Sequence, residues 1–213
     1  TVSKIEKFVN SCGNVLAYDS ETTGLAYGKD ILGVSYYCPT LDKALFIPNN
    51  KFFSRGVSIN EFQSSLVGIK NKKGILHNAK FDINVFGYWG VPTPTLFKDT
   101  QLMCHRYDPD NKKNLETRVK YDLKVDKLTF EEIIGKKWDK INWFVEGDTL
   151  LDALAEYACE DVYYTYKLYE YYQPLLEKDN LTKILDDLEI YFGNCIQEIG
   201  LKQAKKIFQN IFP

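Results

Sequence analysis

Runs of hydrophobic residues separated by polar breaks divide the first half of the chain into short strands and helices. Runs rich in Val, Ile, Leu and Tyr predict four strands, at 14–20, 31–38, 43–48 and 74–77. Apolar residues at helical spacing predict three helices, at 3–10, 59–71 and 78–90. Asn78 is the expected cap of the third helix. The Pro-rich stretch 91–98 is expected to be a loop that leads into a helix capped by Asp99.

The second half is dominated by one long periodic segment, which predicts a helix over 149–179. Thr149 followed by Asp152 resembles a capping box at its start, and Pro174 is expected to kink or break it near its end. Further helices are expected at about 114–124, 129–135 and 181–199. Strands that come first, followed by helices alternating with one more strand, predict an α/β layered fold.

Composition places the chain among ordinary globular proteins and excludes several functional classes. Of 213 residues, 45% are hydrophobic and 26% charged, and no stretch approaches the roughly 20 apolar residues of a membrane span. The N-terminus lacks a signal-peptide pattern, so a cytoplasmic or other reducing compartment is expected. Five scattered cysteines with no C-x-x-C pair argue against a zinc ribbon or a disulfide framework. Because the net charge is −2, any contacts to nucleic acid must be local or carried by metal ions.

Two carboxylates follow the first predicted strand, one residue apart. Residues i and i+2 of a strand point to the same face, so Asp19 and Glu21 project together from its C-terminal end. At about 4 Å and an effective dielectric near 20, their repulsion costs roughly 4 kcal/mol. Either a shared proton or a divalent cation can offset this cost, and oxygen-only ligands suit Mg²⁺ or Mn²⁺. Taken alone, the pair is more simply explained as a solvated strand end.

Two further pairs place an acid four residues after a polar side chain. Asn78 and Asp82 share one face of the third predicted helix, and this helix starts where a buried strand ends. Tyr157 and Asp161 share one face of the long helix. Each pair could by itself be ordinary surface, and the long helix is so rich in tyrosine that one Tyr proves little.

Taken together and in this order, the three motifs resemble those of the DEDD exonuclease superfamily, in the subtype with tyrosine in the third motif. The segments "YDSETTGL", "LHNAKFD", "TFEEIIGK" and "YACEDVYYT" are similar to the proofreading exonuclease domain of family A, Klenow-type, DNA polymerases. The resemblance covers roughly residues 14–178. It implies a ribonuclease-H-like mixed β-sheet flanked by α-helices, and a 3′-5′ exonuclease that releases nucleoside 5′-monophosphates from DNA 3′ ends.

The resemblance also implies the site. It assigns two divalent metal ions, Mg²⁺ or Mn²⁺ with Zn²⁺ as an alternative at one position, to Asp19, Glu21, Asp82 and Asp161. Asp19 would bridge both ions, Glu21 and Asp161 would complete the first site, and Asp82 would hold the second partly through water. Such ions clamp the attacking and leaving oxygens of the phosphodiester. Tyr157 would orient the attacking water, because a phenol with a pKa near 10 is a poor base at neutral pH.

Four other positions match residues that hold DNA in this family. Thr22 and Leu25 would contact the terminal nucleotide, Phe130 would pack on the terminal bases and Asn78 would lie near the 3′ end. Stacking of this kind is worth about 1–3 kcal/mol per base and tolerates any sequence. Without the resemblance, Leu25 and Phe130 would be interpreted as core. His77 stands where an amide is expected, and it is interpreted as a hydrogen-bonded strand-end residue.

The expected organisation is an exonuclease domain at 1–178 and a helical tail at 179–213 that resembles the lead-in to a polymerase thumb. The expected partners are a single-stranded DNA 3′ end and a covalently linked polymerase domain absent from this chain, with no membrane. The sequence leaves open whether the chain is a fragment or a stand-alone nuclease. Two alternative functions also remain, an RNA exonuclease similar to ribonuclease D and a catalytically silent structural domain of a polymerase.

Overall fold

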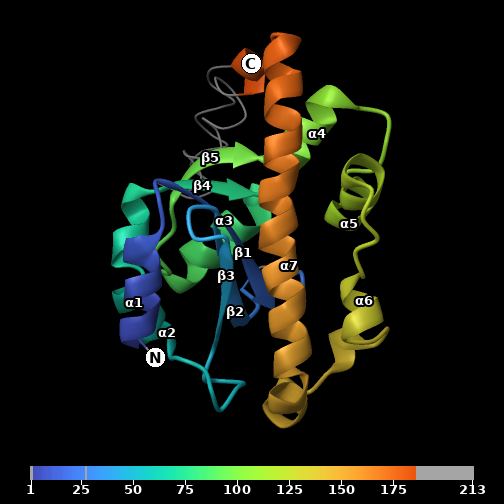
Figure 1. The fold of residues 1–213 in the computed structure, drawn as a ribbon. Coiled ribbons are helices and arrows are strands. Elements are labelled where there is room, and N and C mark those ends of the chain that lie inside the picture. Colours follow the sequence, from blue (N-terminus) through green and yellow to red (C-terminus); the bar gives the residue numbers. More distant parts are fainter. Residues whose placement is uncertain (1, 27, 186–213) are drawn as a thin grey trace, which may run out of the picture.

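A five-stranded mixed sheet forms the centre of the computed structural model, which describes residues 2–26 and 28–185 (Figure 1). Its strands are β1 (Val15–Thr22), β2 (Ile31–Cys38), β3 (Lys43–Pro48), β4 (Lys73–Leu76) and β5 (Thr95–Asp99). They lie in the order β3-β2-β1-β4-β5. The β1/β2 and β2/β3 pairs are antiparallel, whereas β1/β4 and β4/β5 are parallel. The predicted α/β class is confirmed.

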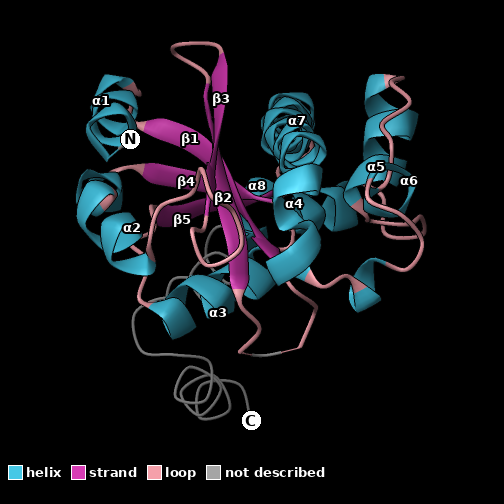
Figure 2. Cartoon of the chain, turned by 90° about the horizontal axis from the view of Figure 1, so that it is seen from below, coloured by secondary structure: helices cyan, strands magenta, loops and turns pink. Residues whose placement is uncertain are grey.

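Helices cover both faces of this sheet (Figure 2). The α-helices are α1 (Val2–Ser11), α2 (Ile59–Ser65), α3 (Ala79–Trp89), α4 (Thr100–Tyr107), α5 (Leu115–Arg118), α6 (Phe130–Ile133), α7 (Trp143–Lys178) and α8 (Thr182–Ile184). Shorter 3-10 or π turns are η1 (Val67–Asn71), η2 (Val119–Leu123) and η3 (Trp138–Lys140). The fold therefore has the layered helix–sheet–helix arrangement that the order of elements predicts.

The two faces of β1 pack against different helices because strand side chains alternate. Leu16 and Tyr18 lie in a core with residues of α1, α2 and α3. Ala17 faces the other way and packs with Val162 of α7. Asp19 and Glu21 continue the Ala17 side of the strand, so the alternation sends both carboxylates toward α7.

Two sequence predictions are wrong in this region. The stretch 91–98 is not only a loop, because its second half enters β5, which pairs in parallel with β4. The Pro residues of this stretch favour a loop in the sequence pattern, and the strand that follows them has only five residues. The long helix begins at Trp143 rather than near residue 149, with Asn142 accepting a hydrogen bond from the Phe144 backbone N–H. The Thr149 hydroxyl lies inside the helix and donates to the Glu146 carbonyl oxygen.

Pro174 does not end helix α7, which continues to Lys178. The predicted helix at 59–71 is divided into α2 and the 3-10 turn η1. Asn78 stands at the cap position of α3, but its side chain makes no capping hydrogen bond. The prediction for 181–199 is met by α8 over its first residues, whereas 186–213, and with it most of the predicted tail 179–213, lies outside the described residues.

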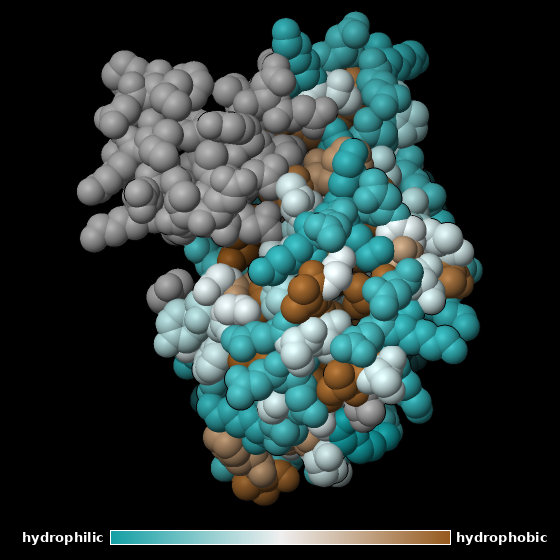
Figure 3. Space-filling view, turned by 90° about the vertical axis from the view of Figure 1, so that its left-hand side faces the viewer, coloured by the Kyte–Doolittle hydropathy of each residue, from teal (hydrophilic) through white to brown (hydrophobic). Residues whose placement is uncertain are grey.

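The face of the molecule seen in Figure 3 is mainly hydrophilic, with hydrophobic residues in small separated groups. Within the described part of the chain, no helix combines the length and the apolar character needed to cross a membrane. The cysteines described, Cys12, Cys38, Cys104 and Cys159, are all free thiols.

Candidate active site

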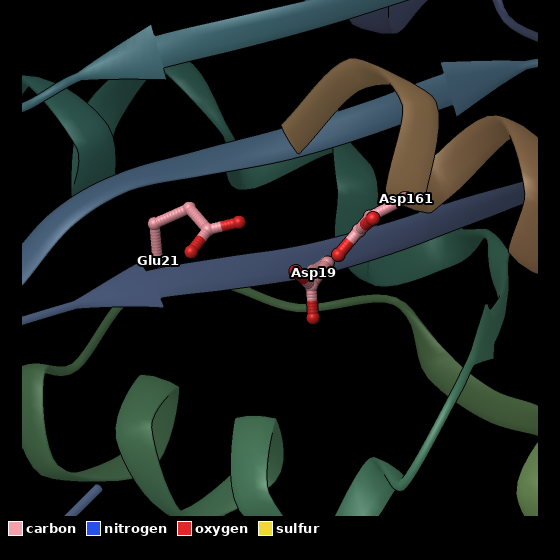
Figure 4. Close-up of side chains that lie close together, drawn as sticks. All are labelled: Asp19, Glu21 and Asp161. Atoms are coloured by element: carbon pink, nitrogen blue, oxygen red, sulfur yellow. The ribbon is translucent and has the colours of Figure 1, made fainter. Parts of the chain in front are cut away.

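Three carboxylates from β1 and α7 meet at one point. Asp19 and Glu21 extend from the same side of β1, and Asp161 reaches them from α7 (Figure 4). One ligand oxygen of each lies within 4.8 Å of the others, with Glu21 and Asp161 buried and Asp19 partly buried. Helix α7 presents Asp161 because it belongs to the buried stripe that also includes Tyr157, Ala158 and Thr165. Asp161 stands 140 positions after Glu21 in the chain, and the fold brings the two into a single cluster.

Asp82 lies beside this cluster, in the first turn of α3. It is 2% exposed, and its Oδ1 accepts hydrogen bonds from the Ser20 backbone N–H at 3.0 Å and from the Ser20 hydroxyl at 2.5 Å. The carboxyl groups of Asp82 and Asp19 are close enough to share a hydrogen bond. The structure therefore brings together all four predicted acids, with Asp82 adjoining the group of three rather than belonging to it.

Burial and mutual repulsion make these acids hard to ionise. Burial first, and then the charges of Asp82 and Glu21, hold the pKa of Asp19 well above its usual range. Burial and the charge of Asp161 do the same for the pKa of Glu21. Burial raises the pKa of Asp82 to about 7, against the opposing hydrogen bonds from Ser20. Burial raises the pKa of Asp161 to about 6, against the opposing effect of Lys127.

Lys127 is a member of the site that the sequence analysis missed. Its side chain is fully buried, and its Nζ lies 2.6 Å from Asp161 Oδ1 and 4.0 Å from the centroid of the Tyr157 ring. No pattern in the sequence marks it, since a lysine between Asp126 and Leu128 is indistinguishable from an ordinary loop residue. Only the fold shows that this side chain points inward while its neighbours are exposed.

Tyr157 stands one helical turn before Asp161 and is 7% exposed. Its hydroxyl lies 3.4 Å from Glu116 Oε1, a weak contact, and Glu116 is a second residue beside the site that the sequence analysis did not identify. Burial, together with the charges of Asp161 and Glu21, raises the pKa of Tyr157 above its ordinary value. The residue is therefore a neutral phenol at physiological pH, which suits an orienting hydroxyl and not a base.

A pocket of about 410 Å³ opens directly onto Glu21 and Tyr157. Its wall contains Thr22, Leu25 and Phe130, three of the residues predicted to contact DNA. The Phe130 ring packs edge-on against Tyr157 at 5.2 Å and against Trp138 at 5.4 Å, so an aromatic wall faces the acids. Leu25 is 75% exposed and is not core. The volume lies within the range of roughly 300–1,000 Å³ typical of small-ligand pockets.

Asn78 lies away from this pocket, on the wall of a second hollow of about 350 Å³. Leu25 and Phe81 line both the pocket and this hollow, so the two cavities are adjacent and these two side chains lie between them. Asn78 adopts a left-handed conformation, with φ of 67°, and its backbone N–H donates to Asp99. His77 lies within hydrogen-bonding distance of the Thr100 hydroxyl and the Lys113 carbonyl oxygen, as interpreted from the sequence, and has no nitrogen left for a ligand.

The donor set fits a hard divalent cation. All candidate ligand atoms are carboxylate oxygens, which Mg²⁺ and Mn²⁺ prefer. Glu21 Oε1 is buried and has no hydrogen-bond partner among the described residues, which is costly unless something binds it. A cation at this point would satisfy that oxygen and offset the repulsion within the cluster.

Solved structures define the class of fold to which this arrangement belongs. NrnC of Brucella melitensis bound to pGG is similar over 87% of this chain and 84% of its own, with a TM-score of 0.65 at 20% identity. The catalytic core of RRP6 from Trypanosoma brucei, as a cysteine-to-serine mutant, is similar over 88% of this chain and 49% of its own, with a TM-score of 0.63 at 17% identity. The fold is thus the ribonuclease-H-like α/β fold.

Sequence comparison gives the particular family. The profile described as 3′-5′ exonuclease, of the DNA polymerase A type, matches residues 1–177, and the chain belongs to this family. The DNA polymerase I of Borreliella burgdorferi is 25% identical over 195 residues, and that of Chloroflexus aurantiacus 27% identical over 213. These alignments cover 86% and 90% of this chain but 20% and 22% of the relatives. The chain spans about a fifth of the length of the curated relatives it matches.

Proposed function

We propose that this 3′-5′ exonuclease domain removes nucleotides from single-stranded DNA 3′ ends in a reaction that depends on divalent cations. The observation that carries the proposal is the convergence of four acids and the Tyr157 hydroxyl beside a pocket with an aromatic wall. Asp19, Glu21 and Asp161 would hold one cation, and Asp82 together with Asp19 would hold the second. When bound, such ions activate water and stabilise the leaving oxygen.

The other side chains would position the substrate. The neutral Tyr157 hydroxyl, near the acids, is placed to hold the attacking water by a hydrogen bond while the phenol keeps its own proton. Phe130 and the exposed Leu25 offer apolar surface to a terminal base, and Thr22 lies on the same wall. Because stacking does not depend on base identity, this wall suits an enzyme that removes any nucleotide. Asn78, on the wall of the neighbouring hollow, would contact the DNA strand near its 3′ end.

DNA is favoured over RNA because the curated relatives are DNA polymerases. The same relatives support proofreading as the biological role, with residues 1–178 as the exonuclease domain, 179–213 as a helical lead-in, and a linked polymerase domain as partner. A silent structural domain is disfavoured because all four acids and Tyr157 are present and converge.

The deciding experiment compares 5′-labelled single-stranded DNA with RNA of the same sequence, in Mg²⁺, in Mn²⁺ and in chelator. Stepwise shortening of DNA from its 3′ end that stops in chelator and with Asp19→Ala supports the proposal. Degradation of RNA alone selects the ribonuclease alternative. A folded chain that degrades neither substrate in either metal overturns the proposal and selects the silent domain.

A further inference from the structure

The buried Lys127 ammonium is the feature of the site that the proposed chemistry leaves unexplained. Its immediate neighbours in the chain are exposed, with the Asp126 side chain at 82% and Leu128 at 55%, whereas the Lys127 side chain is at 0%. A buried ammonium is costly unless a carboxylate pairs with it. Its nearest partner is Asp161, at 2.6 Å, and the more exposed Glu160 is 3.9 Å away.

The position of this charge matters because Asp161 is one of the three acids that could share a cation. Lys127 also attracts Glu21, a second member of that group. The ammonium rests on the face of the Tyr157 ring, which holds it in place by a cation–π contact. A positive charge is thus fixed at the edge of the carboxylate cluster before any ion arrives.

We propose that Lys127 is an internal counter-cation that sets the divalent-ion concentration at which the site is filled. In the ion-free protein it neutralises Asp161 and limits repulsion among the acids. A divalent ion that approaches Asp161 must either displace the ammonium from Oδ1 or bind beside a like charge, and either course weakens its binding. The inference deepens the proposed function, on which it rests for the identity of the metal-binding acids.

Lys127→Met tests this directly, because it removes the charge and keeps much of the apolar stem. The loss of the electron paramagnetic resonance signal of free Mn²⁺ measures binding. Circular dichroism, recorded in chelator and in Mn²⁺, measures thermal unfolding. We expect Lys127→Met to bind Mn²⁺ at least tenfold more tightly than the unmodified chain. We also expect its melting temperature to fall in chelator and its rise on adding Mn²⁺ to be larger. If Lys127 only filled space, its replacement by Met would not tighten Mn²⁺ binding.

Two matched variants complete the design. Lys127→Arg keeps the charge and should keep the weaker Mn²⁺ affinity. Lys120→Met removes an exposed lysine that pairs with Asp126 at 2.6 Å, and should change neither measurement. If Lys127→Met is unfolded in chelator, refolding by Mn²⁺ supports the proposal, whereas failure to refold in millimolar Mn²⁺ overturns it. Unchanged or weaker Mn²⁺ affinity in a folded Lys127→Met chain also overturns it. Neither result depends on nuclease activity, so the proposed function stands or falls separately.

Discussion

Helix α7 carries two buried charge clusters that differ in how well their charges are compensated. In the C-terminal half of the helix, the Tyr172 hydroxyl accepts a hydrogen bond from Arg118, whose side chain is 3% exposed. Arg118 donates to both oxygens of Asp122, at 2.8 and 2.9 Å, and to Asp108 at 2.9 Å. At the middle of the same helix, Asp161 instead joins three other acids, and Lys127 is the one cation among the described residues that pairs with this group.

The difference separates a structural cluster from the proposed active site. In the Arg118 cluster every charged group has hydrogen-bonded partners with good geometry, which is what a buried ion pair needs in order not to destabilise the fold. In the acidic cluster the formal charge would be −3 if all five groups were ionised, counting four acids and one lysine. This excess of negative charge is stable only if protons or bound cations offset it, and under the proposed function the site uses it to bind cations.

The largest expected effect is on the catalysis that we propose for the acidic cluster. Asp82→Asn keeps the shape of the side chain and its acceptor for Ser20 but removes the charge. We expect the rate of DNA shortening to fall by about 10⁴-fold, which corresponds to about 5 kcal/mol in activation free energy. The free energy of unfolding in chelator at pH 8 should rise by on the order of 1–2 kcal/mol, because repulsion is relieved. Single-turnover kinetics and urea denaturation measure the two quantities, and a variant that lost both activity and stability would contradict the comparison.

The converse change breaks the structural cluster. Arg118→Met leaves Asp108 and Asp122 without their cation, and we expect the free energy of unfolding to fall by about 3–5 kcal/mol. The rate per folded molecule should stay the same at a temperature where the variant is folded, because Arg118 lies outside the proposed active site. Urea denaturation with Lys120→Met as the exposed control measures the difference. A loss below about 1 kcal/mol would mean that the cluster is not structural.

The sequence predicted the acidic cluster better than the elements around it. Asp19, Glu21, Asp82 and Asp161 stand at strand and helix positions whose periodicity fixes the face they occupy, and the structure brings them together as expected. Lys127 was missed because it belongs to an irregular segment in which no periodicity tells an inward side chain from an outward one. Its orientation depends on Asp161 and Tyr157, which are distant in sequence.

The errors in the elements have similar causes. For strand β5, Pro92 and Pro94 dominate the local signal and predict a loop, because the pairing of β5 with β4 is a long-range interaction that local propensity does not record. For helix α7, the cap-like Thr149 predicts a start six residues too late, whereas the packing of Trp143 against the core lets the helix begin at Trp143, with Asn142 as its N-cap. In both cases, contacts between residues distant in sequence determine the structure.

The two clusters should respond to pH with opposite signs. The pKa values of Asp82 and Asp161 in the folded chain, about 7 and about 6, exceed the roughly 3.9 of an unfolded Asp. The folded state therefore binds more protons between pH 4 and 7, and stability in chelator should decrease as pH rises through this range, by up to about 1.4 kcal/mol per pH unit for each group. The pKa of Asp108, lowered by its hydrogen bond from Arg118, acts in the other direction, so its contribution is lost below pH 4.

Urea denaturation between pH 4.5 and 8 measures this slope. Saturating Mn²⁺ should flatten or reverse it, because the ion binds the ionised carboxylates. Asp82→Asn should reduce the slope in chelator, whereas Lys120→Met should leave it unchanged. A stability that rises with pH in chelator from 4.5 to 7 would mean that the acids ionise easily and that the charge deficit is not real.

Replacing either of two tyrosines on helix α7 by Phe is the smallest change that tests the comparison, because each substitution removes only a hydroxyl group. Tyr157→Phe should slow DNA shortening by about 10²-fold or more, as expected for a group that positions the attacking water, with little change in stability. Tyr172→Phe should leave the rate unchanged and lower the free energy of unfolding by about 1.5 kcal/mol, because its hydroxyl accepts from Arg118 and donates to the Asp122 carboxylate. If Tyr157→Phe lost stability and kept its rate, its hydroxyl would be structural like that of Tyr172, and the division of α7 into a catalytic and a structural half would fail.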